Sequence, residues 1–428
     1  MATWTAEVFQ NEYLPDGATD VHAIITVTCA DSGQAGDDGS GAAEAIIIDC
    51  SGSMDGPQTK MIAARQAAAA AIGELSDGTW FGVVAGNGGP VIAYPPPALE
   101  VGGMVQADTR TRAQANYAVS QLRARGGTAL GMWLMAANDL FARTPASQKH
   151  AILLTDGKNE GETEQQLAVA ISRVTGQFQC DCRGVGADWD VNELRGIATA
   201  MLGSVDLIAD PAEMAADFRT MMQTAMSRGV ANAKLRVWAP LGAEVLFVRQ
   251  VEPTIDELSA RRVEVTNLIS EFPTGAWGDE SRDYHVAVRV AAKPLGSEQL
   301  AARVQLEVGG QVVGQGLVKA LWSDDSALTT RINPAVAHYT GQAELADVIQ
   351  EGLAAKAAGD EVTATFKLGR AAQLAAETGN DEATNRLKKV VDIEDAETGT
   401  VRLKRAVSKL DEMALDTSST KTTRVRPS

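Results

Sequence analysis

The sequence predicts an α/β domain with a mostly parallel sheet, inserted into a β-sandwich and followed by a helical region. Three observations lead to this fold class. Strand and helix patterns alternate through residues 41–230, which is typical of a parallel sheet covered by helices. Short strands without helices lie on both sides, at 1–40 and 231–330, and helical patterns return at 335–415.

The N-terminal stretch contains two predicted strands, residues 3–9 and 20–29. In the second, DVHAIITVTC, apolar residues occupy every second position from Val21 to Cys29, the period of a half-buried strand. Because a two-stranded hairpin alone is marginally stable, we expect both strands to complete the later sandwich. The Gly-, Ser- and Asp-rich stretch that follows marks a flexible connection.

Residues 41–230 alternate between short apolar segments and longer amphipathic or Ala-rich segments. This pattern predicts strands at 42–49, 80–86, 149–157, 179–186 and 204–209, and helices at 57–75, 109–124, 129–143, 163–174, 191–201 and 211–226.

After residue 229 the pattern changes to turn-bounded strands and then to helices. The predicted strands are 233–239, 243–251, 261–268, 283–292, 302–310 and 315–322, and the predicted helices are 343–358, 361–378, 382–390 and 400–413. Residues 416–428, DTSSTKTTRVRPS, show no apolar periodicity, so we expect a flexible tail.

Composition excludes several classes of function. The chain of 428 residues has 38 Lys and Arg against 55 Asp and Glu, a formal charge of −17, which argues against nucleic-acid binding because phosphate contacts need clustered cations. No leader pattern and no apolar stretch of about 20 residues is found. We therefore expect a cytoplasmic protein without a membrane partner.

The cysteines and histidines give little functional signal. Four cysteines are too few for a disulfide framework in this length of chain. Cys180 and Cys182 resemble half of a zinc site, but no second Cys or His pair has ligand spacing, so small core residues on one strand face are the better interpretation. None of the four histidines is assigned a catalytic role.

The stretch IIIDCSGSMDG, residues 46–56, carries the strongest functional signal. A buried strand ends at Asp49, and Ser51 and Ser53 follow at alternating positions. Carboxylates and hydroxyls are hard oxygen donors that suit magnesium or manganese better than zinc. Asp and Ser also cap helix N-termini, and on this stretch alone both interpretations stay open.

Two later stretches place further oxygen donors where a parallel sheet brings them together. Thr128 lies in the glycine-bounded loop GGTALG before a helix, and Asp156 follows a buried strand in ILLTDG. Ligands of open α/β sheets bind outside the carboxyl ends of strands. Taken singly, Thr128 is better explained as a helix N-cap and Asp156 as a turn residue, whereas their combination with the first stretch is much less ordinary.

The segments D-C-S-G-S, G-G-T-A-L-G and L-L-T-D-G, in this order, resemble the metal-ion-dependent adhesion site of von Willebrand factor A domains. The resemblance covers residues 41–228. It implies a doubly wound, Rossmann-like sheet that binds one divalent cation, Mg²⁺ or Mn²⁺ with Ca²⁺ as a further candidate. Cys50 is expected to point from the strand end into the core. The implied metal ligands are the hydroxyls of Ser51, Ser53 and Thr128, and the carboxylates of Asp49 and Asp156, bound directly or through water.

The resemblance implies a non-enzymatic interaction module, an intracellular scaffold whose bound cation takes an Asp or Glu from a partner protein. The whole layout is similar to bacterial, including actinobacterial, cytosolic members of the superfamily. A metal-assisted hydrolase is the alternative, but it needs a positioned general base. Glu160 and Asp55 are near the site loops in sequence and are expected on solvated turns, so no catalytic residue is assigned.

The C-terminal residues support a further interpretation as a signalling scaffold. Thr422 and Thr423 are candidate phosphorylation sites, and Val425 lies three positions after Thr422. A phosphothreonine followed at this distance by an apolar residue is a ligand type for forkhead-associated domains, after modification by a Ser/Thr kinase. An ordinary frayed terminus is the alternative.

Overall fold

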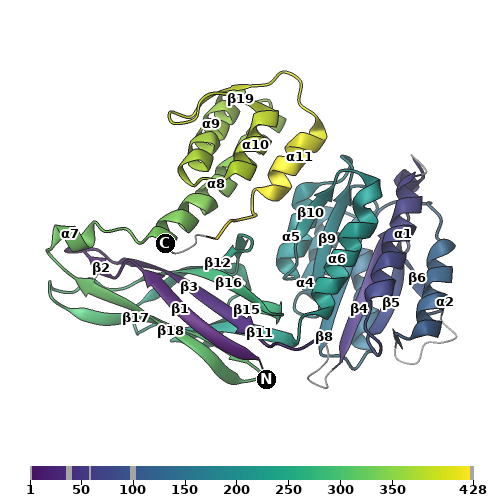
Figure 1. The fold of residues 1–428 in the computed structure, drawn as a ribbon, viewed down its shortest axis with the longest axis horizontal. Coiled ribbons are helices and arrows are strands. Elements are labelled where there is room, and N and C mark those ends of the chain that lie inside the picture. Colours follow the sequence, from purple (N-terminus) through teal and green to yellow (C-terminus); the bar gives the residue numbers. More distant parts are fainter. Residues whose placement is uncertain (1, 35–40, 57–58, 97–102, 425–428) are drawn as a thin grey trace. The chain divides into compact units, whose positions relative to one another are not determined.

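The computed structural model describes residues 2–34, 41–56, 59–96 and 103–424 (Figure 1). The chain folds as two compact units. The first, here called the α/β domain, comprises Ser32–Ala231 with the short segment Gly275–Gly278. The second, here called the sandwich unit, comprises Ala2–Asp31, Asn232–Thr274 and Asp279–Ser428. One unit therefore interrupts the other along the sequence, which confirms the predicted insertion.

A seven-stranded sheet forms the centre of the α/β domain. Its order is β10-β9-β8-β4-β5-β6, and β7 also pairs with β5. Five neighbouring strands run parallel, while β6 and β7 pair antiparallel with β5 at one edge. The bounds are β4 Ala42–Asp49, β5 Trp80–Gly86, β6 Val91–Tyr94, β7 Val105–Gln106, β8 Gln148–Thr155, β9 Gln179–Val185 and β10 Val205–Ile208.

Helices cover both faces of this sheet. The side chains of Phe81 and Val83 share one buried cluster with α1, α2 and α6. A Cβ at Gly82 or Gly86, which alternate with them on β5, would instead collide with side chains of α3. Figure 1 shows α1 and α6 side by side along the sheet, as their contacts require. The helices are α1 Thr59–Glu74, α2 Thr109–Ser120, α3 Leu130–Ala142, α4 Glu164–Val174, α5 Val191–Ala200 and α6 Met214–Met226.

The strand order contains a topological switch point between β4 and β8. From β4 the chain adds β5 on one side, and then β8, β9 and β10 in succession on the other side. In doubly wound sheets, ligands bind in the crevice at the carboxyl ends of the two strands that flank such a reversal. The ends of β4 and β8 are thus the place where a ligand is expected.

Two sheets form the sandwich, antiparallel except for the parallel pair β18–β2, and the N-terminal strands belong to both. β3 pairs with β16 over ten residues, from Asp20↔Arg289 to Cys29↔Glu280, and β2 pairs with β18. One sheet has the order β1-β3-β16-β12-β13, and the other β14-β15-β11-β17-β18-β2. The bounds are β1 Thr3–Gln10, β2 Tyr13–Leu14, β3 Asp20–Ala30, β11 Val230–Trp238, β12 Glu244–Glu252, β13 Asp256–Glu257, β14 Val263–Thr266, β15 Ile269–Trp277, β16 Glu280–Arg289, β17 Glu298–Val308 and β18 Gln311–Trp322.

The C-terminal region combines helices with a hairpin. The elements are α7 Ser326–Thr329, α8 Pro334–Ala357, α9 Glu361–Glu377, α10 Asp381–Val390, β19 Val391–Asp395, β20 Thr400–Leu403 and α11 Lys409–Ser418. The predicted helix at 400–413 is wrong in its first part, because residues 400–403 pair with β19, whereas residues 409–413 lie in α11. Asp395 accepts backbone hydrogen bonds from Glu397 and Thr398, and Gly399 has a φ of 69°, so a turn reverses the chain here.

The prediction of a flexible tail at 416–428 is also wrong for the part that the structure describes, 416–424. Helix α11 continues to Ser418. The next residues run along the segment after β12, where Ile255 N donates to Thr420 O at 2.7 Å and Thr422 N donates to Pro253 O at 3.2 Å. Backbone hydrogen bonds to a distant segment therefore order residues that have no apolar pattern of their own.

Membrane insertion has no candidate segment in the described ranges. None of the helices there combines the length and the apolar character that crossing a bilayer requires.

Candidate metal centre

The carboxyl ends of β4 and β8 bring the two predicted aspartates to the same sheet edge. β4 pairs in parallel with β8 up to Ile48↔Leu154, so Asp49 and Thr155 end neighbouring strands. Thr155 Oγ1 donates to Asp49 Oδ2 at 2.6 Å, and the backbone N of Asp156 donates to the same oxygen at 3.3 Å. Asp49 and Asp156 are both fully buried.

The two serines of the first motif connect these carboxylates. The Ser51 backbone N donates to Asp49 Oδ1 at 2.7 Å, and the hydroxyls of Ser51 and Ser53 lie 2.9 Å apart. Ser53 Oγ donates to Asp156 Oδ1 at 2.6 Å. Four of the five predicted ligand residues thus form one continuous hydrogen-bonded network. Ser51 makes no capping bond to the short helix Gly52–Asp55, so for Ser51 the capping alternative is not what the structure shows.

Thr128 brings a third hydroxyl to the same place. A Cβ on Gly157 would lie 3.2 Å from Thr128 Oγ1 and 3.5 Å from Ser53 Oγ, so the two hydroxyls face one small volume. Only a glycine leaves this volume free. The Thr128 backbone is held by a 2.6 Å hydrogen bond from Gly161 N to its carbonyl oxygen.

The Thr128 side chain does not cap α3, contrary to the simpler sequence interpretation. The N-cap is Ala129, without a side-chain bond, while Asn159 Oδ1 accepts from Leu130 N at 2.9 Å and Glu162 accepts from Gly131 N. Counting only the described residues, the Thr128 hydroxyl has no hydrogen-bond partner. Its oxygen is therefore free to bind a ligand.

Among the described residues, Lys60 is a charged neighbour of the centre that the sequence interpretation missed. Its Nζ lies 2.6 Å from Asp156 Oδ2, and the exposed fractions of the two side chains are 11% and 0%. A sequence signal for this position does exist. Lys60 stands four residues before Ala64, on the buried stripe of α1 that continues through Ala67, Ala68 and Ala71, where a lysine needs a partner.

The electrostatics of the centre favour a positive charge. Burial raises the pKa of Asp49, and the nearby Asp156 raises it further, whereas hydrogen bonds from Ser51 and Thr155 act in the opposite direction. Two buried carboxylates repel each other unless a cation lies between or beside them. In this structure Lys60 supplies that charge.

The donor set fits a hard divalent cation. Three hydroxyls and two carboxylates converge on one edge, and one of the hydroxyls is unpartnered among the described residues. Within the described ranges there is no group of three or more His, Cys, Asp or Glu side chains that could hold a metal. Any cation here would therefore depend on the hydroxyls as much as on the carboxylates.

The remaining sequence assignments in this domain agree with the structure. Cys50 points into the buried cluster under α1, and Cys180 and Cys182 are fully buried on β9. Asp55 and Glu160 are exposed, as expected for residues on solvated turns.

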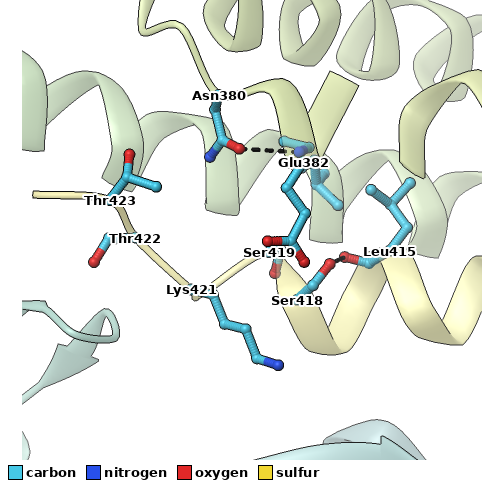
Figure 2. Close-up of a pocket in the computed structure, with 10 residues that line it drawn as sticks. Asn380, Glu382, Leu415, Ser418, Ser419, Lys421, Thr422 and Thr423 are labelled. Carbon is cyan, nitrogen blue, oxygen red and sulfur yellow. Dashed lines mark hydrogen bonds between the residues drawn. The ribbon is translucent and has the colours of Figure 1, made fainter. Parts of the chain in front are cut away.

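The candidate phosphorylation sites lie in the sandwich unit, in the segment after α11 (Figure 2). Thr422 Oγ1 donates toward Val251 O at 2.6 Å and Glu252 Oε2 at 2.7 Å. Thr423 is exposed. Burial raises the pKa of Glu252, which the Thr422 hydrogen bond partly counteracts. The residues after Arg424, including Val425, lie outside the described ranges.

Arg424 anchors the same segment. Its guanidinium donates two hydrogen bonds to Asp283, at 2.9 and 3.1 Å, and Tyr339 donates a third at 2.5 Å. The pocket beside Thr422 and Thr423, drawn in Figure 2, has a volume of about 30 Å³. This volume is far below the roughly 300–1,000 Å³ of small-molecule pockets.

Comparison with known proteins gives a consistent result. A family described as von Willebrand factor type A domain matches residues 44–206, and one described as von Willebrand factor type A C-terminal domain matches residues 373–419. No protein with a curated description matches this chain.

Solved structures extend the similarity to the whole chain. A von Willebrand factor type A protein from Catenulispora acidiphila is 48% identical and has a TM-score of 0.93, covering 99% of this chain and 97% of its own. The ArnB paralog VWA2 from Sulfolobus acidocaldarius is 14% identical with a TM-score of 0.57, covering 98% of both chains. The human COPII-coat protein Sec24c is 12% identical with a TM-score of 0.53, covering 90% of this chain and 57% of its own. The last two share the fold alone.

Proposed function

Because this chain belongs to the von Willebrand factor type A family, we propose that its α/β domain binds a partner protein through a divalent cation, Mg²⁺ or Mn²⁺. Von Willebrand factor A domains are generally protein-interaction modules. The cation, when bound, would supply the positive charge that attracts an Asp or Glu of the partner. The convergence of three hydroxyls and two carboxylates at the switch point is the observation that supports this proposal.

The residues of the centre would have different roles in binding the cation. Asp49 is held by donors from both strand ends and orients the first loop. Ser51, Ser53 and Thr128 would offer neutral oxygens, which leave the positive charge of a cation largely unneutralised and available to a partner carboxylate. Asp156 would add the second negative charge. An acidic partner would otherwise be repelled by a chain of net charge −17.

The test is the Mg²⁺ affinity of Thr128→Val, measured by calorimetry, together with thermal unfolding in chelator. The Thr128 hydroxyl has no hydrogen-bond partner among the described residues, so its removal should leave metal-free stability within about 0.5 kcal/mol while weakening Mg²⁺ binding about tenfold or more. Thr175→Val is the matched control. The Thr175 hydroxyl bonds Ile171 O at 2.8 Å on the exposed end of α4, away from the centre. Equal Mg²⁺ affinity of Thr128→Val and the natural chain would overturn the proposal.

The partner contact itself can be measured by affinity capture from the native lysate. Capture should occur with Mg²⁺ and disappear with chelator, and Thr128→Val should need a higher Mg²⁺ concentration for the same capture. Partners retained in chelator would show an interaction that does not use the centre.

The C-terminal segment provides a second candidate contact, in which a Ser/Thr kinase modifies Thr423 or Thr422 and a forkhead-associated domain reads the phosphothreonine. Thr423 is exposed and favours kinase access. Thr422 is bonded to Val251 and Glu252, so a kinase could reach it only after the segment is released. Binding of phosphorylated and unmodified peptides spanning 415–428 to such domains tests this idea, and equal binding would exclude it.

A further inference from the structure

We infer that the Lys60 ammonium pairs with the Asp156 carboxylate in the metal-free centre and competes with the divalent cation for that carboxylate. This inference rests on the proposed function and concerns the regulation of the same site. It makes the metal affinity of the centre depend on a residue that is not one of its five oxygen donors.

The contact geometry is the starting point. Each carboxylate oxygen of Asp156 has one partner among the described residues: Ser53 Oγ donates to Oδ1 and Lys60 Nζ donates to Oδ2, both at 2.6 Å. The Asp156 side chain is fully buried, and that of Lys60 is 11% exposed. Such burial is costly for an ammonium unless it is paired, so Asp156 is what holds Lys60 in this position.

The ammonium and a divalent cation would pair with the same carboxylate and would repel each other. They are therefore alternative occupants of the centre. Asp49 and Asp156 place two carboxyl groups at the buried sheet edge, and the Lys60 ammonium pairs directly with Asp156. A divalent cation bound among the same oxygens would lie within a few ångströms of the ammonium. At such distances two positive charges in a partly buried place repel each other, because little water lies between them to screen the repulsion.

The Lys60 side chain can leave Asp156 without a movement of the backbone. It is the second residue of α1 (Thr59–Glu74), and the lysine side chain is a flexible four-carbon stem with a strongly hydrated end. The ammonium can therefore turn to solvent by side-chain rotation alone, while Ala64 and the rest of the helix stay packed. The exchange requires no rearrangement of the sheet.

The consequence is a centre with two forms, which differ in the cation that pairs with Asp156. In one form the ammonium pairs with the Asp156 carboxylate, and the hydrogen-bonded network is in place without a divalent cation. In the other the cation holds the oxygens and the ammonium is displaced. The observed affinity is lowered by the fraction of molecules in the first form, so the natural chain would bind Mg²⁺ more weakly than its five donors allow.

The experiment compares Lys60→Met and Lys60→Gln with the natural chain by Mg²⁺ calorimetry and by thermal unfolding, with and without chelator. Lys158→Met is the matched control, because Lys158 is an exposed lysine two residues after Asp156 and its removal changes the net charge equally. Both Lys60 variants should bind Mg²⁺ at least about tenfold more tightly than the natural chain. In chelator they should unfold at a lower temperature, and Mg²⁺ should raise that temperature more than it does in the natural chain.

The outcomes separate this inference from the proposed function. Unchanged or weaker Mg²⁺ binding by both Lys60 variants, with the natural chain binding normally, would overturn the competition and leave the proposed function standing. Binding by the variants but not by the natural chain would support the competition and overturn the proposed function of the natural chain. Absence of binding in every variant would overturn both. An equal gain in Mg²⁺ affinity by Lys158→Met would show that loss of any nearby positive charge has this effect. It would overturn the inference.

Discussion

Thr155 donates a 2.6 Å hydrogen bond to Asp49, and this bond joins the ends of the two strands that flank the topological switch point. Both side chains are fully buried. The Asp49 carboxylate also accepts from the backbone of Ser51 and Asp156. Asp49 is thus a structural residue of the strand ends as well as a candidate ligand.

We therefore expect Asp49→Ala to lose metal-free stability as well as metal binding. The substitution leaves three donors, two of them backbone N–H groups, without their acceptor, and each unsatisfied buried group costs about 1–3 kcal/mol. Relaxation recovers part of this, so the α/β domain should lose about 2–4 kcal/mol. Urea unfolding in chelator measures the loss. Asp49→Asn is the control, since it keeps an acceptor oxygen, and equal stability of the Ala variant and the natural chain would contradict this role.

Thr422→Glu is expected to release the C-terminal segment from the sandwich unit. The substitution removes the hydroxyl that bonds Val251 and Glu252 and places a carboxylate beside the Glu252 carboxylate. Lost bonds and like-charge repulsion should destabilise the docked segment by about 1–3 kcal/mol. Amide hydrogen exchange at Ile255, whose N donates to Thr420 O, should become faster.

The matched control for this release is Thr423→Glu. Thr423 is exposed, so the same change in charge one residue later should leave exchange at Ile255 unaltered. Comparable acceleration in both variants would mean that general charge, and not the Thr422 contact, governs docking.

Deletion of residues 2–30 should abolish cooperative unfolding of the sandwich unit and leave the α/β domain folded. The deletion removes β3, the strand between β1 and β16, together with Val21, Ile25 and Val27, which are at most 1% exposed. Domain-resolved hydrogen exchange of the shortened chain is the measurement. If the amides of β16 stay protected from hydrogen exchange in the shortened chain, the sandwich does not depend on the β3–β16 pairing and the prediction is contradicted.

His150 is expected to make the α/β domain less stable at alkaline pH. Its ring nitrogens lie 2.7 Å from Glu44 Oε2 and 3.0 Å from Asp181 Oδ2. Burial alone would lower the pKa of His150, but the two carboxylates outweigh it and raise the pKa to about 9. A raised pKa contributes stability that is complete below about 6.5 and is lost as the pH rises through about 9. Unfolding of wild type and His150→Gln between pH 6 and 10 tests this, and parallel curves would contradict it.

His285 is expected to make the sandwich unit less stable at acidic pH, the opposite direction to His150. Burial, with smaller effects of His22 and Arg249, lowers the pKa of His285 to about 3. A neutral buried histidine contributes stability that is present above about pH 6.5 and is lost as the pH falls toward 3, because the unfolded chain takes up the proton first. His285→Gln should flatten acid unfolding of this unit between pH 6.5 and 4, while an unchanged slope would assign the acid sensitivity to other groups.

Sequence reasoning succeeded where short-range patterns determine structure. The strands that end at Asp49 and Thr155 are short apolar runs between turn residues, and the three motifs lie at predictable strand ends and loops. Strand β15 was missed because Pro273 and Gly275 interrupt its pattern. The pairing of Thr400 with Asp395 was missed because an amphipathic stretch of this length is also compatible with a helix.

The rest depends on contacts between residues far apart in the chain. Lys60 and Asp156 are separated by 96 residues, and Arg424 and Asp283 by 141. No local pattern states that a lysine on an apolar stripe will find a carboxylate, or that an extended polar segment will find backbone acceptors. The sequence shows only that each of these groups needs a partner.

The two ends of the inserted α/β domain touch each other. A Cβ on Gly229 would lie 1.9 Å from the carbonyl oxygen of Ser32, so the incoming and outgoing chain pass in direct contact and only a glycine fits. The chain therefore leaves for the inserted segment and returns from it at neighbouring backbone positions. A whole domain can be inserted between two such neighbouring positions while the strands on either side of it still pair, as β3 does with β16.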